Sequence, residues 1–410
     1  MTLRSSHAHL SPSHLALVLT YLNLLVLLLP RQTSDWEYTA TITPWLWAIC
    51  SPPSRAHLMQ IAKENRFLVL SAALGSVWIL IGTLTRQVTD EWRAASTPIL
   101  WLPISAILEQ SAYKTTTTTK RAIQAVLGIA IFLTFLVLAH QWFVDKHPRP
   151  PGLSFNVLTG PMLLMMACLF IATESSHQST QKKILLTLIA IASVGGSMMT
   201  QARTALICFI AGWICYAIFL PKFSKRIFAY GALTSIIWAL LISPRFNVIQ
   251  SDISKYENGS HRSSLGERTD AIVWGLQHFF DKPWFGYGQE LLRQAFNLRW
   301  VEWHQPEQSI TKILHLHNDY LQLALSYGIP TLTLTLAFWL GLTKTIHKSS
   351  ASKRQRAACK AMLTILATTS LVDSFTHWQG LWAMCVTCAA IAFTICRQPT
   401  DVENKYPNTL

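Results

Sequence analysis

The sequence is poor in charged residues, and this scarcity excludes several classes of protein. Only 13% of its 410 residues are Asp, Glu, Lys or Arg, whereas an average globular domain has about 25%. Apolar side chains make up 51% of the chain. Disordered chains, coiled coils and ordinary soluble enzymes all need more charge than this. The composition therefore predicts an all-α polytopic membrane protein.

Acidic residues are scarcer than basic ones. The chain has 20 Asp and Glu against 34 Lys and Arg, which gives a formal charge of +14. A basic excess often indicates nucleic-acid binding. In a membrane protein, however, the same excess is expected in the cytoplasmic loops. We therefore expect a membrane partner and no nucleic acid.

Cysteine is absent from the longest polar stretch, residues 244–329. All eight cysteines lie in or beside apolar segments, which excludes a disulfide-stapled external domain. The pair Cys385 and Cys388 resembles a redox or metal motif, but its apolar surroundings favour packed thiols. Residues 1–30 lack the small-residue cleavage site of a signal peptide, so 14–30 is expected to be a retained helix.

Apolar runs predict about twelve membrane helices, because crossing a bilayer takes about 20 apolar residues. Two of the runs, 36–50 and 96–110, are weaker because they contain prolines. The others are 14–30, 67–84, 121–143, 157–173, 184–200, 203–220, 226–243, 330–346, 358–375 and 380–396.

The distribution of Lys and Arg predicts the orientation of these spans. With both weak runs counted, most cations of the short loops fall on one side, including a cluster between residues 344 and 360. The opposite short loops hold only Arg31, Arg86, Arg93, Lys146, Arg149 and Arg203. The cation-rich side should be cytoplasmic. Residues 244–329 then lie outside. If one weak run did not span the membrane, every later loop would change sides and the cation cluster at 344–360 would lie outside, against this rule.

The predicted organisation has four parts. Residues 1–243 form the N-terminal membrane helices, and 244–329 form an external loop with short helices. Residues 330–396 form the C-terminal membrane helices, and 397–410 form a cytoplasmic tail. No repeat of fixed period is present, which excludes a solenoid.

Individual arginines, rather than a basic patch, are the candidate anion ligands. Between residues 244 and 314 the cations and anions are equal in number. Ser264 and Glu267 have the spacing of a capping box, so a helix should start there and end at Asp281–Pro283. Arg268 would then lie in the first turn, where a helix terminus and a guanidinium can bind phosphate together. The alternative is a surface ion pair with a neighbouring carboxylate.

Two histidines precede a second helix. Asn318 or Asp319 is the expected N-cap of a helix ending at Tyr327. His315 and His317 would then sit at the membrane boundary. Three interpretations remain open: a metal site, a structural pair, or an acid/base histidine. Zinc needs three or four ligands, and the nearest others, His304 and Glu307, have no recognised spacing.

Arg203 lies in Gln201-Ala-Arg-Thr204, between two apolar runs joined almost without a loop. A charge there is costly if it enters the bilayer, so an arginine at this position is a site hypothesis by default. Its simpler interpretation is snorkelling to the interface.

Together these segments resemble the O-antigen ligase and polymerase superfamily of bacterial envelope glycosyltransferases. The resemblance covers about 185–345. It rests on Gln201–Thr204, on Arg268 with Trp274, on Asp281-Lys-Pro-Trp-Phe-Gly-Tyr-Gly288, and on His317-Asn-Asp-Tyr-Leu-Gln-Leu-Ala-Leu-Ser-Tyr-Gly328-Ile-Pro330.

The resemblance implies an inner-membrane protein with about twelve spans and a periplasmic loop that caps a lateral cavity. It implies a glycan donor on undecaprenyl diphosphate and an acceptor on lipid A–core. The family's two key arginines match Arg203 and Arg268, and its key histidine matches His317. The expected substrate-binding set is Arg203, Arg268, His315, Asn318 and Arg262.

The expected chemistry uses neither metal nor cofactor. The arginines can neutralise the leaving diphosphate, and His317 can take the acceptor proton. No Asp-x-Asp motif is present to hold a metal. A single displacement would invert the anomeric centre.

Several other activities share these motifs or this topology. A polymerase or a protein O-oligosaccharyltransferase would differ only in the acceptor, and the short tail after residue 396 argues against the second. A secondary transporter is a different class. It should place polar groups at mid-membrane, whereas Asp373, near the outer end of its span, is the main exception to uncharged spans.

Overall fold

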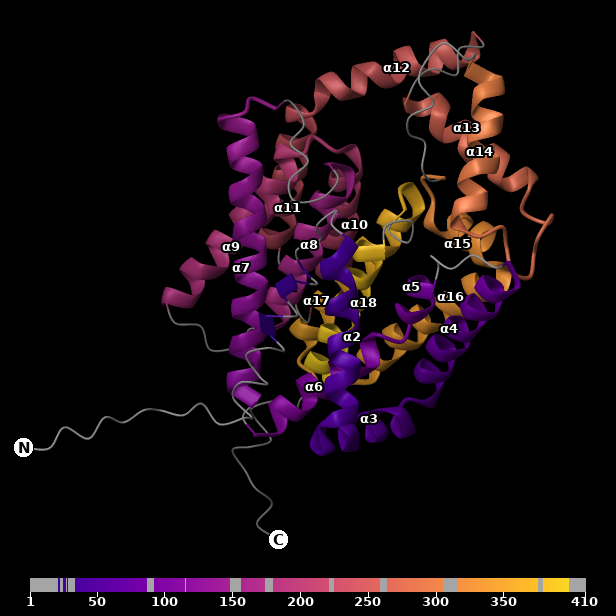
Figure 1. Cartoon of the computed structure of the whole chain (residues 1–410). Helices are drawn as coiled ribbons and strands as arrows, with labels where there is room; N and C mark the ends of the chain where they lie inside the picture. The colour runs from indigo at the N-terminus through magenta and orange to yellow at the C-terminus, as the bar shows by residue number, and fades with distance from the viewer. Residues whose placement is uncertain are drawn as a thin grey trace, which may run out of the picture.

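The computed structural model describes residues 34–86, 92–114, 116–147, 156–173, 180–220, 225–258, 264–304, 316–374 and 379–397, with a few residues between 21 and 28. Within these ranges the only regular elements are helices (Figure 1). The chain is therefore all-helical in its described part, as the composition predicts.

The apolar runs form helices because a backbone in lipid must satisfy its own hydrogen bonds. The helices of the N-terminal part are α2 (Ser34–Cys50), α3 (Pro52–Glu64), α4 (Arg66–Arg86), α5 (Trp92–Ser96), α6 (Trp101–Lys114), α7 (Thr116–Phe143), α8 (Asn156–Thr173), α9 (Thr180–Met199), α10 (Arg203–Phe219) and α11 (Lys225–Leu241). Those that follow residue 328 are α16 (Ile329–Lys348), α17 (Lys353–Val372) and α18 (Gln379–Arg397).

The helix boundaries follow the predicted spans closely, with one break. The run 96–110 begins at the end of α5, passes through a turn at residues 97–100, which contains Pro98 and separates α5 from α6, and becomes helical again only at Trp101. Proline lacks the amide donor that a continuous helix needs there. Most of the predicted helix 14–30 lies outside the described residues.

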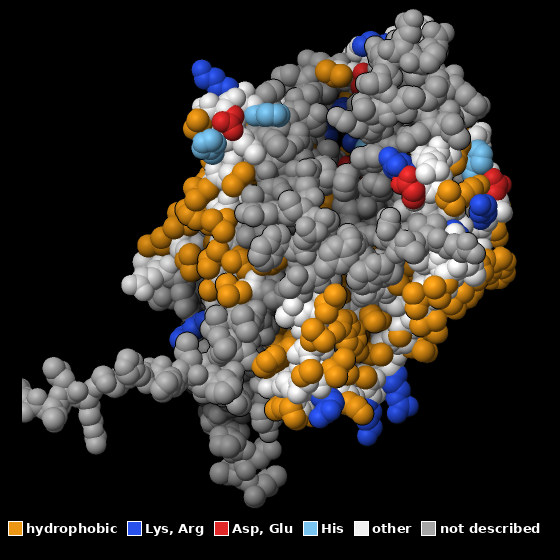
Figure 2. All heavy atoms as spheres, in the orientation of Figure 1, with side chains coloured by type: hydrophobic (Ala, Val, Ile, Leu, Met, Phe, Trp, Pro, Cys, Tyr) orange, Lys and Arg blue, Asp and Glu red, His pale blue; other side chains and the backbone are white. Residues whose placement is uncertain are grey.

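Three helices of the described chain are long and apolar enough to cross a membrane: Arg66–Arg86, Thr119–Phe143 and Ile329–Lys348. The other apolar helices are shorter, at 10–17 residues in their apolar parts. Figure 2 shows hydrophobic side chains gathered over α7 and α9 on one flank and over α4 on the other. A helical membrane protein exposes its apolar side chains in this way because they face lipid.

Helices α17 and α18 lie at the centre of the bundle. Every residue of α18 from Leu381 to Cys396 is buried, and α17 packs against α8, α10 and α16. Cys385 and Cys388 are buried, free thiols, as expected for packed cysteines. The centre of the molecule is therefore formed by C-terminal helices packed against helices from the middle of the chain.

Four further helices form a cap at one end of the bundle (Figure 1). They are α12 (Ser243–Glu257), α13 (Ser264–Gln277), α14 (Gln289–His304) and α15 (Asp319–Tyr327). A small core joins α13, α14 and α15, and it is formed by Ala271, Trp274, Leu292, Phe296, Leu316, Leu321 and Leu325. This apolar core fixes α13 and α14 against α15, which in turn contacts the bundle.

The predicted capping box on α13 is displaced. Ser264 lies inside the helix rather than at its N-cap, so Arg268 lies one turn within α13. The helix also ends at Gln277, before the predicted stop, and residues 278–285 form turns. The field of the helix terminus falls off within the first turn. Any attraction of Arg268 for an anion must therefore come mainly from its own charge.

The segment 283–288 ties the cap to the bundle. The amides of Tyr287 and Gly288 donate to the carbonyls of Leu325 and Ser326, at 2.7 and 2.8 Å. The Ile329 amide donates to the Pro283 carbonyl at 2.8 Å. These bonds clamp the junction between α15 and α16, so the glycine-rich motif has a scaffolding role.

The segment 283–288 also contacts helix α4. Trp78 donates from Nε1 to the Trp284 carbonyl at 2.7 Å and stacks on Phe285 at 4.9 Å between ring centroids. Arg86 donates to the Phe285 carbonyl. Helices from both halves of the chain thus hold the same six residues.

Replacing Gly328 by alanine should prevent correct assembly of this junction. Gly328 has φ +90°, and an added Cβ would lie 1.7 Å from the Trp284 carbonyl oxygen. Positive φ and a backbone clash together should cost about 3 kcal/mol or more. We expect little folded protein, measured as the yield of monodisperse protein in detergent and its thermal midpoint.

Gly75→Ala is the matched control, because its Cβ would meet only Leu334 Cβ at an ordinary 3.8 Å. A Gly328→Ala protein as stable as Gly75→Ala would contradict the proposed clamp.

Candidate functional site

His317 is fixed by the residues on either side of it. Its backbone adopts φ +52°, a conformation that non-glycine residues seldom take without compensation. Before it, the Leu316 amide donates to Gln322 Oε1 at 3.0 Å. After it, Asn318 caps α15 by accepting from the Leu321 amide at 2.9 Å. The strained turn holds the imidazole in one place.

The start of α15 is fastened to the end of α17. Asn318 Nδ2 donates to the Leu371 carbonyl at 3.0 Å, and Tyr320 Oη donates to the Ala367 carbonyl at 3.3 Å. Asp319 is buried and accepts from the hydroxyls of Ser370 and Ser374 at 3.0 and 2.9 Å. A buried carboxylate is tolerated only when it is hydrogen-bonded in this way.

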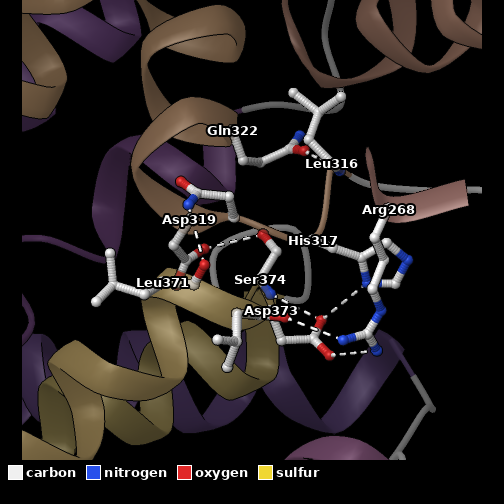
Figure 3. Close-up of polar contacts among 10 residues, drawn as sticks. Arg268, Leu316, His317, Asp319, Gln322, Leu371, Asp373 and Ser374 are labelled. Carbon is white, nitrogen blue, oxygen red and sulfur yellow. Dashed lines mark hydrogen bonds and ion pairs between the residues drawn. The ribbon is translucent and has the colours of Figure 1, made fainter. Parts of the chain in front are cut away.

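The Asp373 carboxylate stands between the imidazole and a guanidinium (Figure 3). Its Oδ1 lies 3.6 Å from His317 Nδ1, and its Oδ2 lies 4.0 Å from Arg268 Nη2. Oδ1 also accepts from the Ser374 amide at 2.8 Å. The carboxylate is only 3% exposed, whereas the side chains of His317 and Arg268 are 18% and 30% exposed. The two basic groups therefore reach solvent above a buried anion.

This arrangement sets the roles of the two ring nitrogens. A carboxylate next to Nδ1 favours the tautomer with its proton on Nδ1. Nε2, on the other side of the ring, is then the basic nitrogen. The imidazole can thus accept a proton at Nε2, on the edge of the ring away from Asp373.

Arg268 is positioned from α13 against the end of α17. Its Nη1 also contacts the Val372 carbonyl at 3.5 Å. On the other side of α13, Tyr256 of α12 donates to Asp270 at 3.3 Å. Burial, and the Asp270 carboxylate, raise the pKa of the Tyr256 phenol, so it stays protonated and keeps donating. These contacts orient the helix that carries the guanidinium.

Arg203 begins α10 after a very short turn. Helix α9 ends at Met199, and Gln201 adopts φ +49°. The Thr200 hydroxyl accepts from the Ala202 amide at 3.3 Å. A residue with positive φ therefore positions each side chain: His317 adopts this conformation itself, whereas Arg203 follows Gln201, which adopts it.

The pairing of α10 with α17 places Arg203 near the same end of the bundle. Cys208 Sγ contacts Thr369 Oγ1 at 3.1 Å. One turn further along α10, Gly212 lies against Ile365, one turn back along α17. The two helices are therefore antiparallel, and continuing this register brings Arg203 level with the residues just after α17.

Of the other predicted substrate-binding residues, the structure describes only Asn318. His315 and Arg262 lie outside the described residues, as do Glu307 and His377. Asn318 is the N-cap of α15 and also bonds to α17, so its side chain has a structural role. Among the described residues, no group of three or more His, Cys, Asp or Glu is placed to hold a metal ion.

Asp373 is the residue that sequence reasoning missed as part of the site. Its charge at the end of an apolar span was a signal, because ionisable groups there are usually functional. Its partners could not be inferred, since they follow from the packing of α15 and α13 onto α17.

Comparisons with known proteins bear on the same segment. Residues 188–336 match the family model described as O-Antigen ligase. The chain is also 24% identical over 245 residues to an O-antigen ligase of Escherichia coli (strain K12), which is 56% of this chain and 57% of that protein. It thus spans little more than half the length of this relative. Arg203, Arg268 and His317 fall inside the matched segment, whereas Asp373 lies beyond it.

Proposed function

We propose that this chain, which is similar to O-antigen ligases in both comparisons, is itself an O-antigen ligase. It would transfer a glycan from undecaprenyl diphosphate to a sugar of lipid A–core. The observation that carries this proposal is the cluster of His317, Asp373 and Arg268 at the capped end of the bundle. It supplies a base and a cation side by side, which glycosyl transfer from a diphosphate needs.

In the proposed topology about twelve helices span the bacterial inner membrane, and residues 244–329 face the periplasm. The scarcity of Lys and Arg in the short loops on the same side supports this orientation. The cap formed by α12 to α15 then covers the site from the periplasmic side.

The proposed reaction is a single displacement. The acceptor hydroxyl attacks the anomeric carbon, and its proton passes to His317 Nε2. The bond from that carbon to the diphosphate oxygen breaks, and its electron pair leaves with undecaprenyl diphosphate. The configuration at the anomeric carbon is inverted.

Arg268 and Arg203 would hold the diphosphate. Guanidinium groups remain charged and match phosphate oxygens in pairs. Asp373 would stabilise the imidazolium that forms and keep Arg268 beside it. Diphosphate is already a good leaving group, so we expect the reaction to need neither metal nor cofactor.

Transfer with purified components tests this function. The assay combines the full chain, lipid-linked O-antigen and rough lipopolysaccharide, with EDTA present. We expect a ladder of modified lipopolysaccharide.

Longer lipid-linked chains without the ladder would identify a polymerase. Glycan attached to an added protein acceptor would identify a protein O-oligosaccharyltransferase. Movement of the donor across a vesicle membrane without covalent transfer would identify a transporter.

Asp373→Asn should lower kcat about 100-fold with a smaller change in the KM for the donor. The amide keeps the size of the carboxylate but cannot stabilise an imidazolium, and substitutions of this kind act mainly on the chemical step. Initial transfer rates at varied donor concentration would measure the effect.

Asp145→Asn serves as the control for Asp373→Asn, since Asp145 pairs with His140 at 3.4 Å on an exposed part of the chain. Asp373→Glu should recover part of the rate. If Asp373→Asn changed only the thermal midpoint and left kcat intact, Asp373 would be a structural residue.

A further inference from the structure

An apolar cavity of about 280 Å³ lies between α15, α16, α17 and α18. Its walls are mainly Leu336, Trp339, Leu340, Leu363, Leu366 and Trp382. Leu340 is 70% exposed and Leu336 is 38% exposed, so the cavity reaches the outer surface of α16. A lining of this kind favours a hydrocarbon chain.

The two ends of the cavity differ in charge. At the end nearer the cap, its lining includes the Asp319 carboxylate and the Ser370 hydroxyl. At the other end, the lining includes Thr343 and Leu363. His347 lies one turn beyond Thr343 on α16, and Lys360 lies one turn before Leu363 on α17. Residues three or four apart share a helix face, so these two basic residues stand at the second end.

Lys360 is a cation that is largely withdrawn from solvent. It is 8% exposed. Its Nζ lies 3.0 Å from His347 Nδ1 and 3.7 Å from the centre of the Phe219 ring. A buried ammonium normally has a carboxylate partner. No Asp or Glu of the described part of the chain forms an ion pair with it.

The surrounding sequence offers no neutralising charge. Residues 329–372 contain no Asp or Glu. They contain six lysines and arginines: Lys344, Lys348, Lys353, Arg354, Arg356 and Lys360.

Two acidic residues of the described chain that lie at this end, Glu64 and Glu109, are already paired with Arg397. Arg397 contacts Glu64 at 2.5 Å and Glu109 at 2.6 Å. Cys396 and Cys359 touch at 3.8 Å, so Arg397 is close to the level of Lys360. The excess of positive charge among the described residues at the cavity mouth therefore favours binding of an anion.

We propose that this cavity binds an anionic phospholipid, with an acyl chain between α16 and α17 and the phosphate at Lys360 and His347. The inference goes beyond the proposed transfer reaction, and it uses the cytoplasmic placement of residues 344–360. Basic pockets between membrane helices suit such headgroups. A polyprenyl diphosphate entering from the cap would instead bring its charge next to the Asp319 carboxylate.

Thermal stability of the purified full chain in detergent tests the site. Dioleoylphosphatidylglycerol should raise the thermal midpoint by roughly 2–4 °C at saturation, and dioleoylphosphatidylcholine should not. Lys360→Met combined with His347→Gln should lose most of this shift. Replacing a buried charge by an apolar residue of similar volume is often neutral for folding. His347→Gln alone changes an exposed residue and gives a partial loss in a protein that folds normally.

Two more variants separate charge from shape. Leu340→Trp should fill the cavity and reduce the shift while every cation is kept. Lys63→Gln, on an exposed position of α3, removes the same charge elsewhere and should keep the full shift.

Three results would overturn the proposal. The first is an equal shift with phosphatidylcholine. The second is an equal shift with inorganic phosphate alone, which would reveal an anion site without a lipid site. The third is a competition in which polyprenyl diphosphate displaces phosphatidylglycerol from the wild type but does not bind Leu340→Trp. That result would assign the cavity to the donor chain.

Discussion

Replacing His317 by alanine is expected to abolish glycan transfer while the protein still inserts and folds. General-base catalysis contributes about 10²- to 10⁴-fold to a rate, so we expect a loss of about 1,000-fold or more. His317 is the imidazole that the structure places beside Asp373, at 3.6 Å. Initial rates on rough lipopolysaccharide, with the amount of monodisperse protein measured in parallel, provide the test.

His140→Ala is the matched control, because His140 also lies beside an aspartate, Asp145, but is 63% exposed. It should transfer normally. His315→Ala should have a milder effect than His317→Ala. Equal losses at His315 and His317 would contradict the assignment of the base.

Arg268→Lys is expected to lose about 100-fold in transfer although it keeps its charge. The Arg268 guanidinium lies beside Asp373 and the Val372 carbonyl and still offers N–H groups to diphosphate. A lysine ammonium has no planar set of donors that could do both. Loss of one donor that stabilises developing negative charge typically costs about 10²- to 10³-fold. The measurement is the transfer rate as a function of donor concentration.

Arg293→Lys controls for the chemistry of the substitution. Arg293 makes a paired contact with Glu290, at 2.9 and 2.6 Å, on the surface of α14. Exposed pairs contribute little, so this variant should behave as wild type. Near-normal transfer by Arg268→Lys would rule out the paired diphosphate contact.

The helices could be predicted because their signal is local. The apolar runs predicted the bounds of α10 and α16 to within two residues. Asn318 was predicted as an N-cap because a polar side chain just before an apolar run commonly caps a helix. Ser264 shows the limit of the same reasoning. A capping box predicts a helix start, but α13 already includes Ser264 as its first residue.

The geometry of the site could be predicted only in part because it is not local. Arg203, Arg268 and His317 were predicted from the sequence, whereas the carboxylate that lies between His317 and Arg268 was not. Asp373 reaches them only because α17 packs against α15 through the hydroxyls of Ser370 and Ser374. The attachment of Trp284 and Phe285 to α4 has the same origin, since it joins segments about 200 residues apart.

The position of Asp373 near the end of the chain has a consequence for biosynthesis. A ribosome that has made His317 must add 56 more residues before Asp373 exists, which takes roughly 3–11 s at ordinary elongation rates. During that interval the growing chain carries its imidazole and its arginines without the carboxylate that orients them. If the proposed reaction is correct, a nascent or truncated protein is thus poorly equipped to transfer a lipid-linked glycan to water, and we expect activity only once α17 and Asp373 are in place.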